Sequence, residues 1–254
     1  MPHMLISDRH YFNKNTMTTY IYSLDENHVV KINMNDKYNI IYSEDEILKM
    51  LIKKYKKIII RASSNITNLS EFIKSLDNEI TFLQFELPII CDSCFQLDKM
   101  PYHLTTLSII CEKLVVPLNN LPPTLVKLQI KTVQSYDFPL ERLPITLQIL
   151  YLETEYNKPL NNLPPYLRIL LINEITEPET LSNLPNELKK LCLVKFYIFK
   201  FNNLPNSLEE IIFPDRLCIS FNKFVYYEYK NELKKDYPKL KWRTQVTRSF
   251  LEEV

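Results

Sequence analysis

Residues 118–130 read LNNLPPTLVKLQI, and this stretch is one copy of a pattern that recurs six times from residue 97 onward. The pattern is Leu-x-x-Leu-Pro-x-x-Leu-x-x-Leu-x-Leu, with other apolar residues at a few of the leucine positions. Successive copies are 21, 22, 20, 21 and 20 residues apart, as measured between Pro101, Pro122, Pro144, Pro164, Pro185 and Pro205. Such regular spacing indicates a chain built from stacked repeats.

The last part of each copy predicts a short β-strand. Leu128 and Ile130 alternate with polar residues, which is typical of a strand that buries one face. The matching pairs are Leu107/Ile109, Leu150/Leu152, Leu170/Ile172, Leu191/Leu193 and Ile211/Phe213. One strand per repeat of this length predicts an α/β solenoid, the leucine-rich-repeat horseshoe, with a parallel sheet on its concave face and leucines filling the interior behind.

Proline and asparagine predict a bend before each strand. Proline costs little where the backbone turns and makes no ladder hydrogen bond. The preceding pairs also form turns: Asn119/Asn120, Asn161/Asn162, Ser182/Asn183 and Asn202/Asn203. Units this short leave little room for helices, so we expect a mostly non-helical convex side.

The pattern weakens toward both ends, as terminal units should. Ser43-x-x-Glu46 and Asn68-x-x-Glu71 resemble capping boxes that open short helices. Asp77 takes the proline position of one early unit, and a helix over 222–235 precedes a last strand that ends near Trp242. We expect about nine stacked strands between residues 58 and 242. The alternation over 17–43 predicts a β-hairpin that caps the first strand.

These elements define four segments. They are an N-terminal β cap (1–43), helix-containing first repeats (44–96), six proline-type repeats (97–214) and a C-terminal cap (215–254).

Composition argues against several classes of partner. Apolar residues make up 46% of the 254 residues, and 31 basic side chains face 30 acidic ones, so no net field attracts nucleic acid or an anionic membrane. The basic C-terminal residues Lys234, Lys235, Lys239, Lys241, Arg243 and Arg248 have acidic neighbours and read better as a solvated cap.

No apolar run reaches the roughly 20 residues of a membrane helix, and the N-terminus does not read as a secretory signal. We therefore expect a cytoplasmic protein.

Residues 156–170 resemble an FNIP repeat. The stretch YNKPLNNLPPYLRIL carries the resemblance, and residues 136–140, YDFPL, repeat its opening. FNIP repeats are a leucine-rich variant found in social amoebae and in giant DNA viruses of amoebae. The resemblance covers about residues 97–213 and implies a solenoid that binds proteins, in host cytoplasm or virion if the source is viral.

Two family associations find no support in the sequence. Viral FNIP proteins often carry an N-terminal F-box, which is all-helical, whereas residues 1–43 read as strand and turn. Bacterial effectors with similar proline-type repeats carry a catalytic domain after them, but only 12 residues follow Trp242.

Strand positions that point away from the leucine interior form the candidate partner site. On neighbouring strands, Ile149, Tyr151, Ile169 and Leu171 predict an exposed apolar patch. The alternatives are that a terminal segment or a second copy covers it, or that its members are scattered surface residues. The full candidate set is Ile149, Tyr151, Ile169, Leu171, Lys127, Gln129, Lys131, Glu153, Lys190 and Ile212.

Little in the sequence points to metal or catalysis. Cys91, Cys94, His103 and Cys111 have the residue types of a zinc site, but the repeat places them on different segments. With no glycine the chain cannot form a P-loop, a dinucleotide fingerprint or a Gly-x-Ser-x-Gly elbow. We expect no enzyme, no cofactor and no small-molecule substrate.

The leading hypothesis is therefore a non-enzymatic scaffold that binds another protein on the concave face. The alternatives are a structural component of a larger assembly such as a virion, and a ubiquitin-ligase adaptor without a recognisable F-box.

Overall fold

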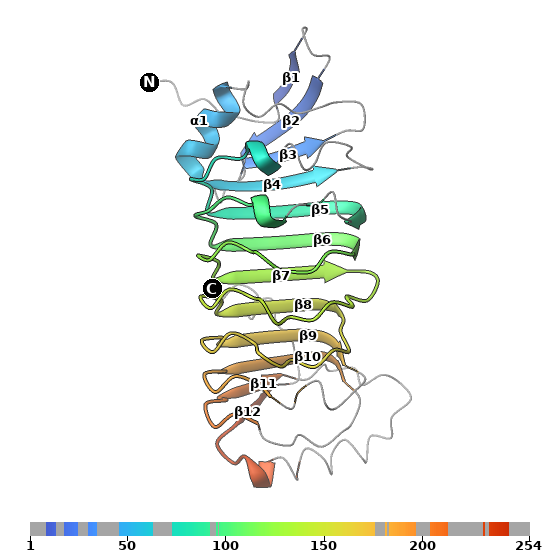
Figure 1. Cartoon of the computed structure of the whole chain (residues 1–254), viewed down its shortest axis with the longest axis vertical. Coiled ribbons are helices and arrows are strands. Elements are labelled where there is room, and N and C mark those ends of the chain that lie inside the picture. Colours follow the sequence, from blue (N-terminus) through green and yellow to red (C-terminus); the bar gives the residue numbers. More distant parts are fainter. Residues whose placement is uncertain are drawn as a thin grey trace.

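A computed structural model describes residues 9–13, 18–24, 30–34, 46–62, 73–91, 95, 97–175, 181, 183–196, 204–212, 231 and 234–243. In these residues the strands form one sheet of 12, stacked along the molecule in chain order (Figure 1). They are β1 Arg9–Asn13, β2 Thr18–Leu24, β3 Val30–Met34, β4 Lys57–Ala62, β5 Phe82–Cys91, β6 Thr106–Leu114, β7 Lys127–Thr132, β8 Ile149–Glu155, β9 Ile169–Ile175, β10 Lys190–Phe196, β11 Glu210–Ile212 and β12 Lys241–Arg243.

The pairing confirms the predicted solenoid. From β3 to β12 every strand runs parallel to its neighbour, and β4–β12 are the nine strands predicted between residues 58 and 242. At the N-terminal end β2 pairs antiparallel with β3, as expected for a hairpin, and β1 pairs antiparallel with β2. The hairpin thus covers the edge that β4 would otherwise expose.

Each repeat prolyl residue begins a tight turn that leads into its strand. The carbonyl of Pro122 accepts a hydrogen bond of 3.1 Å from the amide of Leu125, and the other five repeat prolines do the same at 3.0–3.2 Å. Asp77, in the proline position of an earlier unit, makes the equivalent bond to Ile80 at 3.2 Å. The turn directs the chain into the strand, and proline fits because its position there requires no N–H donor.

Two asparagines that lie two residues before repeat prolines adopt a backbone conformation that glycine usually takes, in a chain without glycine. Asn120 and Asn162 have φ of 60° and 63°, in the left-handed region that most residues avoid. Asparagine tolerates this conformation better than other non-glycine residues.

Replacing Asn120 therefore tests the turn. We expect Asn120→Ala to lower the free energy of unfolding by about 1 kcal/mol, because the Cβ of alanine makes the left-handed conformation unfavourable. Asn120→Gly should be close to neutral, because glycine has no Cβ. Urea denaturation followed by circular dichroism measures both. Equal losses for the two variants would show that the side-chain amide, and not the backbone, matters.

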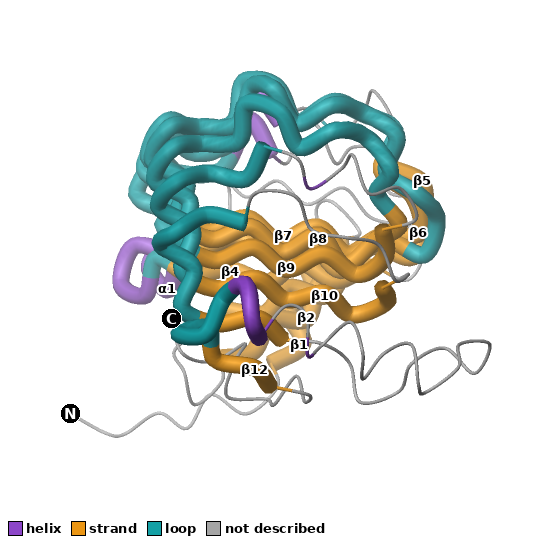
Figure 2. Tube along the Cα trace, turned by 90° about the horizontal axis from the view of Figure 1, so that it is seen from below, coloured by secondary structure: helices purple, strands orange, loops and turns teal. Residues whose placement is uncertain are grey.

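The core lies between the sheet and a layer of loops. Figure 2 looks along the stack and shows the strands superposed as one layer, with the loops arching over it as a second layer. The repeat leucines fill the space between them, including Leu128, Leu150, Leu170 and Leu191, which are fully buried. Because each coil covers the apolar side of the next, the core is continuous along the solenoid.

The loop layer contains little helix among the described residues, as predicted. One α-helix, α1 Glu46–Tyr55, precedes β4, and a short 3₁₀ helix, η2 Leu97–Lys99, precedes β6. Residues 73–75, within the second predicted helix, are helical, and so are 231 and 234–236 from the predicted C-terminal helix. Ser43, Asn68 and residues 222–230 lie outside the described residues.

Hydroxyl groups tie successive coils together in the loop layer. The Thr124 hydroxyl lies 2.7 and 3.0 Å from the carbonyl oxygens of Tyr102 and Leu104 and shares its one proton between them, and Thr146 repeats the arrangement one coil on. The buried Tyr136 hydroxyl accepts a bond of 3.1 Å from the amide of Leu118. These bonds satisfy backbone groups that the loops leave without ladder partners.

Candidate partner-binding face

The predicted site residues lie on one face of the sheet, the face opposite the loop layer, here called the outer face. The strand register places them in three rows across neighbouring strands. The first row contains Lys127, Ile149, Ile169 and Lys190, the second Gln129, Tyr151, Leu171 and Ile212, and the third Lys131 and Glu153. The neighbour relations expected from the repeat are therefore confirmed.

The predicted exposure of the apolar members is wrong. Ile149, Tyr151 and Leu171 are at most 3% exposed and form one apolar cluster with Cys192 and Ile212, both fully buried. Ile169 packs against this cluster and is half-buried. The outer face thus carries a second apolar cluster, separate from the core behind the sheet. This cluster is buried within a single chain. Its members are therefore not scattered surface residues, and no second copy is needed to cover them.

The error has a physical origin. Alternation along a strand decides which face of the sheet a side chain occupies, because successive side chains point to opposite faces. It carries no information on what else in the chain lies over that face. Four large apolar side chains on the adjacent strands β8 and β9 are explained as well by a second buried cluster as by a binding patch.

Charged groups border this outer-face cluster. The Lys127 ammonium lies 5.1 Å from the ring centroid of Tyr151, within cation–π range, and burial lowers its pKa. On the other side, Lys190 and the buried carboxylate of Glu210 are 4.0 Å apart. Burial, followed by the charge of Glu210, raises the pKa of the Cys192 thiol to about 12, so this cysteine is not an activated nucleophile.

A polar network occupies the outer face next to the cluster. The Ser108 hydroxyl donates to Gln129 at 3.2 Å, and the Gln129 amide donates to Glu153 at 2.5 Å. The other carboxylate oxygen of Glu153 pairs with Lys131 at 3.0 Å. Three of the predicted site residues, Gln129, Lys131 and Glu153, therefore act as one hydrogen-bonded unit.

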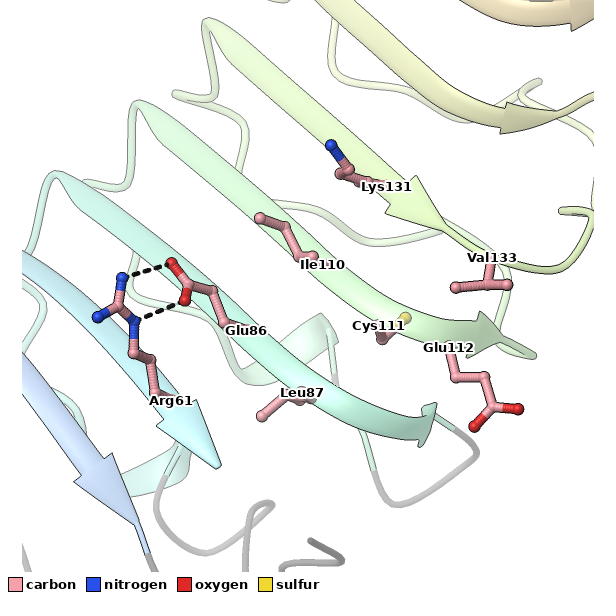
Figure 3. Close-up of a pocket in the computed structure, with 8 residues that line it drawn as sticks. All are labelled: Arg61, Glu86, Leu87, Ile110, Cys111, Glu112, Lys131 and Val133. Carbon is pink, nitrogen blue, oxygen red and sulfur yellow. Dashed lines mark hydrogen bonds and ion pairs between the residues drawn. The ribbon is translucent and has the colours of Figure 1, made fainter. Parts of the chain in front are cut away.

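Beside this network an open groove of about 750 Å³ crosses the carboxyl ends of β4–β7 (Figure 3). The third row continues from Lys131 through Ile110 and Glu86 to Arg61 on β4, and this row supplies most of the charged groups of the groove. The lining residues are Arg61, Glu86, Leu87, Ile110, Cys111, Glu112, Lys131 and Val133.

An ion pair forms one end of the groove. Arg61 donates from Nε to Glu86 Oε2 at 2.6 Å and from Nη2 to Oε1 at 3.3 Å, a two-point contact that holds both side chains in place (Figure 3). The hydrogen bond to Glu86, together with its charge, raises the pKa of Arg61. Gln84 donates to the same carboxylate at 2.7 Å.

Of the groove residues, the predicted set contained Lys131 alone. The sequence does contain a signal for Arg61 and Glu86. They are opposite charges at the same position of adjacent strands, and Lys131 and Glu153 form a second pair of this kind. The strands β5 and β6 also extend beyond the three outward-facing residues per strand expected from the repeat, and on β6 this extension adds Glu112 to the face.

The structure brings Cys91 and Cys111 together but leaves His103 apart: a hydrogen bond from Cys91 lowers the pKa of the Cys111 thiol. Cys91 ends β5 and Cys111 lies within β6, both buried, whereas His103 is exposed in the turn before β6. Cys94 lies outside the described residues. Across the part of the chain that is described, no three His, Cys, Asp or Glu side chains gather as metal ligands would.

None of the described helices is long and apolar enough to cross a membrane.

No family model and no curated protein matches this chain. Among solved structures it is similar to CroV588, a giant-virus protein described as a novel circular LRR protein structure, with a TM-score of 0.51 and 21% sequence identity. The match covers 77% of this chain and 28% of CroV588, so the chain spans less than a third of that protein's length. The likeness agrees with the parallel, helix-poor stack described above: the chain has the leucine-rich-repeat solenoid fold.

Proposed function

We propose that this chain is a non-enzymatic scaffold that binds another protein on the outer face of its sheet. The observation that carries the proposal is the groove across β4–β7, which combines half-exposed charged groups with apolar side chains. Protein interfaces have this mixed composition, and solenoids offer their sheet faces to partners. The contact we propose therefore includes Lys131, Gln129 and Glu153 of the predicted set. It excludes the buried residues Ile149, Tyr151, Leu171 and Ile212.

The source and setting belong to the same proposal. The FNIP resemblance and the likeness to a giant-virus protein support a viral or amoebal origin. If the source is viral, the partner is a host protein and the setting is the host cytoplasm or the virion. Nucleic acid, membranes and small-molecule substrates are not part of the proposed function.

Blocking the groove tests the proposal. Ile110 is half-buried on β6 in the middle of the groove, so Ile110→Arg should fill it without disturbing the core. We expect quantitative affinity purification to show at least one partner whose recovery falls about tenfold or more with this variant. Ile145→Arg is the matched control, since Ile145 is exposed in the turn before β8, at the opposite ends of the strands. Equal recovery of all proteins with the two variants would contradict the proposal.

A further inference from the structure

Two of the buried cysteines lie toward the carboxyl ends of neighbouring strands. Cys91 is the last residue of β5 and Cys111 lies on β6, and both thiols are free. They are 2% and 5% exposed and belong to the same apolar core. Their positions are 20 residues apart, so about one coil of the solenoid separates them along the chain.

The strand pairing brings these two residues toward each other. Cys111 is paired with Leu87 on β5. The register then shifts by one residue, so that Cys91 is paired with Leu114 and lies one position nearer to Cys111 than an unshifted strand would place it. Cys111 and Leu114 are both buried although three positions separate them, so β6 bends around the interior here. Side chains on the inside of such a bend converge.

The two thiols are in contact as a result. The Cys91 thiol donates a hydrogen bond to the sulfur of Cys111, and the main-chain N–H of Cys91 donates a second. Both bonds lower the pKa of the Cys111 thiol, against the opposing effect of burial. Since the thiolate is the nucleophilic form of cysteine, Cys111 is the more reactive member of the pair, and Cys91 is held beside it.

Cys111 is also the member of the pair that borders solvent. It lines the open groove, between Ile110 and Glu112 on β6 (Figure 3). A reagent as small as hydrogen peroxide can therefore reach its sulfur from the groove. Cys192 provides the contrast, because it is fully buried in the outer-face cluster and burial raises its pKa to about 12.

We propose that Cys91 and Cys111 form a site of reversible thiol oxidation, at which a peroxide converts the two thiols into a disulfide bond between β5 and β6. This chemistry is independent of the scaffold function proposed above. In the first step the Cys111 thiolate attacks a peroxide oxygen. The S–O bond of a sulfenic acid forms, the O–O bond breaks, and the leaving hydroxide takes up the proton that the thiol released, giving water.

The second step closes the disulfide. The Cys91 sulfur attacks the sulfur of the sulfenic acid, so that the S–S bond forms and the S–O bond breaks. The leaving hydroxide takes the proton of the Cys91 thiol and departs as a second water. The two thiols are thereby oxidised by two electrons, and one hydrogen peroxide is reduced to two waters.

Peptide mapping of the full chain tests the site. The reduced protein is treated with an equimolar amount of hydrogen peroxide, the remaining thiols are blocked with iodoacetamide, and the chain is digested with trypsin and endoproteinase Asp-N. Cleavage before Asp92 separates Cys91 from Cys94, so mass spectrometry distinguishes their linkages. We expect peptide 77–91 joined to peptide 100–113 as the main product, about tenfold or more above any oxidised form of Cys192.

Variants assign the roles of the two sulfurs. Cys94→Ser is the matched control and should form the linkage as the wild type does. Cys91→Ser combined with Cys94→Ser should form no disulfide at Cys111 and leave a sulfenic acid there, which dimedone labels. Thermal unfolding shows whether each variant is folded, and the peptide map of the wild type requires no variant.

The linkage should also stabilise the fold. It closes a loop of about 20 residues and restricts the unfolded chain, so we expect the melting temperature to rise by about 5–10 °C and to return with dithiothreitol. The proposed site is overturned if Cys91 and Cys111 stay reduced, or if either pairs mainly with another cysteine. It is equally overturned if the double variant still crosslinks Cys111, or if the oxidised protein melts no higher than the reduced one.

Discussion

Leu171→Asp is expected to lower the free energy of unfolding by about 3–5 kcal/mol, because it places a carboxylate in an apolar cluster that excludes water. Leu171 is 2% exposed and packs with Tyr151 and Cys192 on the outer face of the sheet. For a chain of this size the loss corresponds to a fall in melting temperature of about 6–20 °C. Differential scanning calorimetry measures it.

Two controls separate burial from charge. Tyr166→Asp introduces the same carboxylate at a residue that is 60% exposed in the same repeat, and should change stability by no more than about 0.5 kcal/mol. Leu171→Met keeps the volume and should cost less than about 1.5 kcal/mol. A wild-type melting temperature for Leu171→Asp would mean that water reaches this side chain, and it would restore the outer-face cluster as a candidate contact.

The second large effect concerns the core behind the sheet. Leu150 is fully buried near the start of β8, between the coils of β7 and β9. We expect Leu150→Ala to cost about 2–5 kcal/mol, the transfer free energy of the lost methyl groups plus the cavity they leave. Because each coil is stabilised only by its neighbours, a defect at this place weakens both halves of the stack.

Urea denaturation measures this loss through the transition midpoint. Ile145→Ala removes a similar side chain from an exposed position in the turn before β8 and should stay within about 0.5 kcal/mol of the wild type. If Leu150→Ala and Ile145→Ala shift the midpoint equally, Leu150 does not face a packed interior.

The repeat predicts the fold well because its information is local and recurs. Leu128 and Ile130 identify the face of one strand that packs in the core, and the proline six residues before Leu128 identifies the turn. The repeat length then predicts which strands are neighbours. The parallel sheet, the strand count and the register of Tyr151 beside Leu171 all follow from these facts.

The site was harder to predict because it depends on relations that no repeat unit contains. Whether Tyr151 meets solvent depends on the rest of the chain, and the pattern is silent on that point. The groove depends on side chains of β4 and β5, which precede the six proline-type copies, and of β6 in the first copy. The same row position is Arg61 on β4, Glu86 on β5 and Ile110 on β6, so it follows no repeated residue type. A search for charge pairs along the rows, in place of apolar clusters, would have found Arg61 with Glu86.

The constant offset between turn and strand determines where this chain can change length. From each repeat proline to the first core residue of its strand is always six positions, as in Pro122 to Leu128 and Pro205 to Ile211. The one- or two-residue differences between copies therefore all fall between the first core residue of a strand and the next proline, either in the carboxyl-terminal part of the strand, where β8 and β9 shift register after Leu152, or in the loop layer. Insertions and deletions accepted during evolution should accumulate there, and gain or loss of a whole coil should be tolerated more easily than a single residue added beside the sheet.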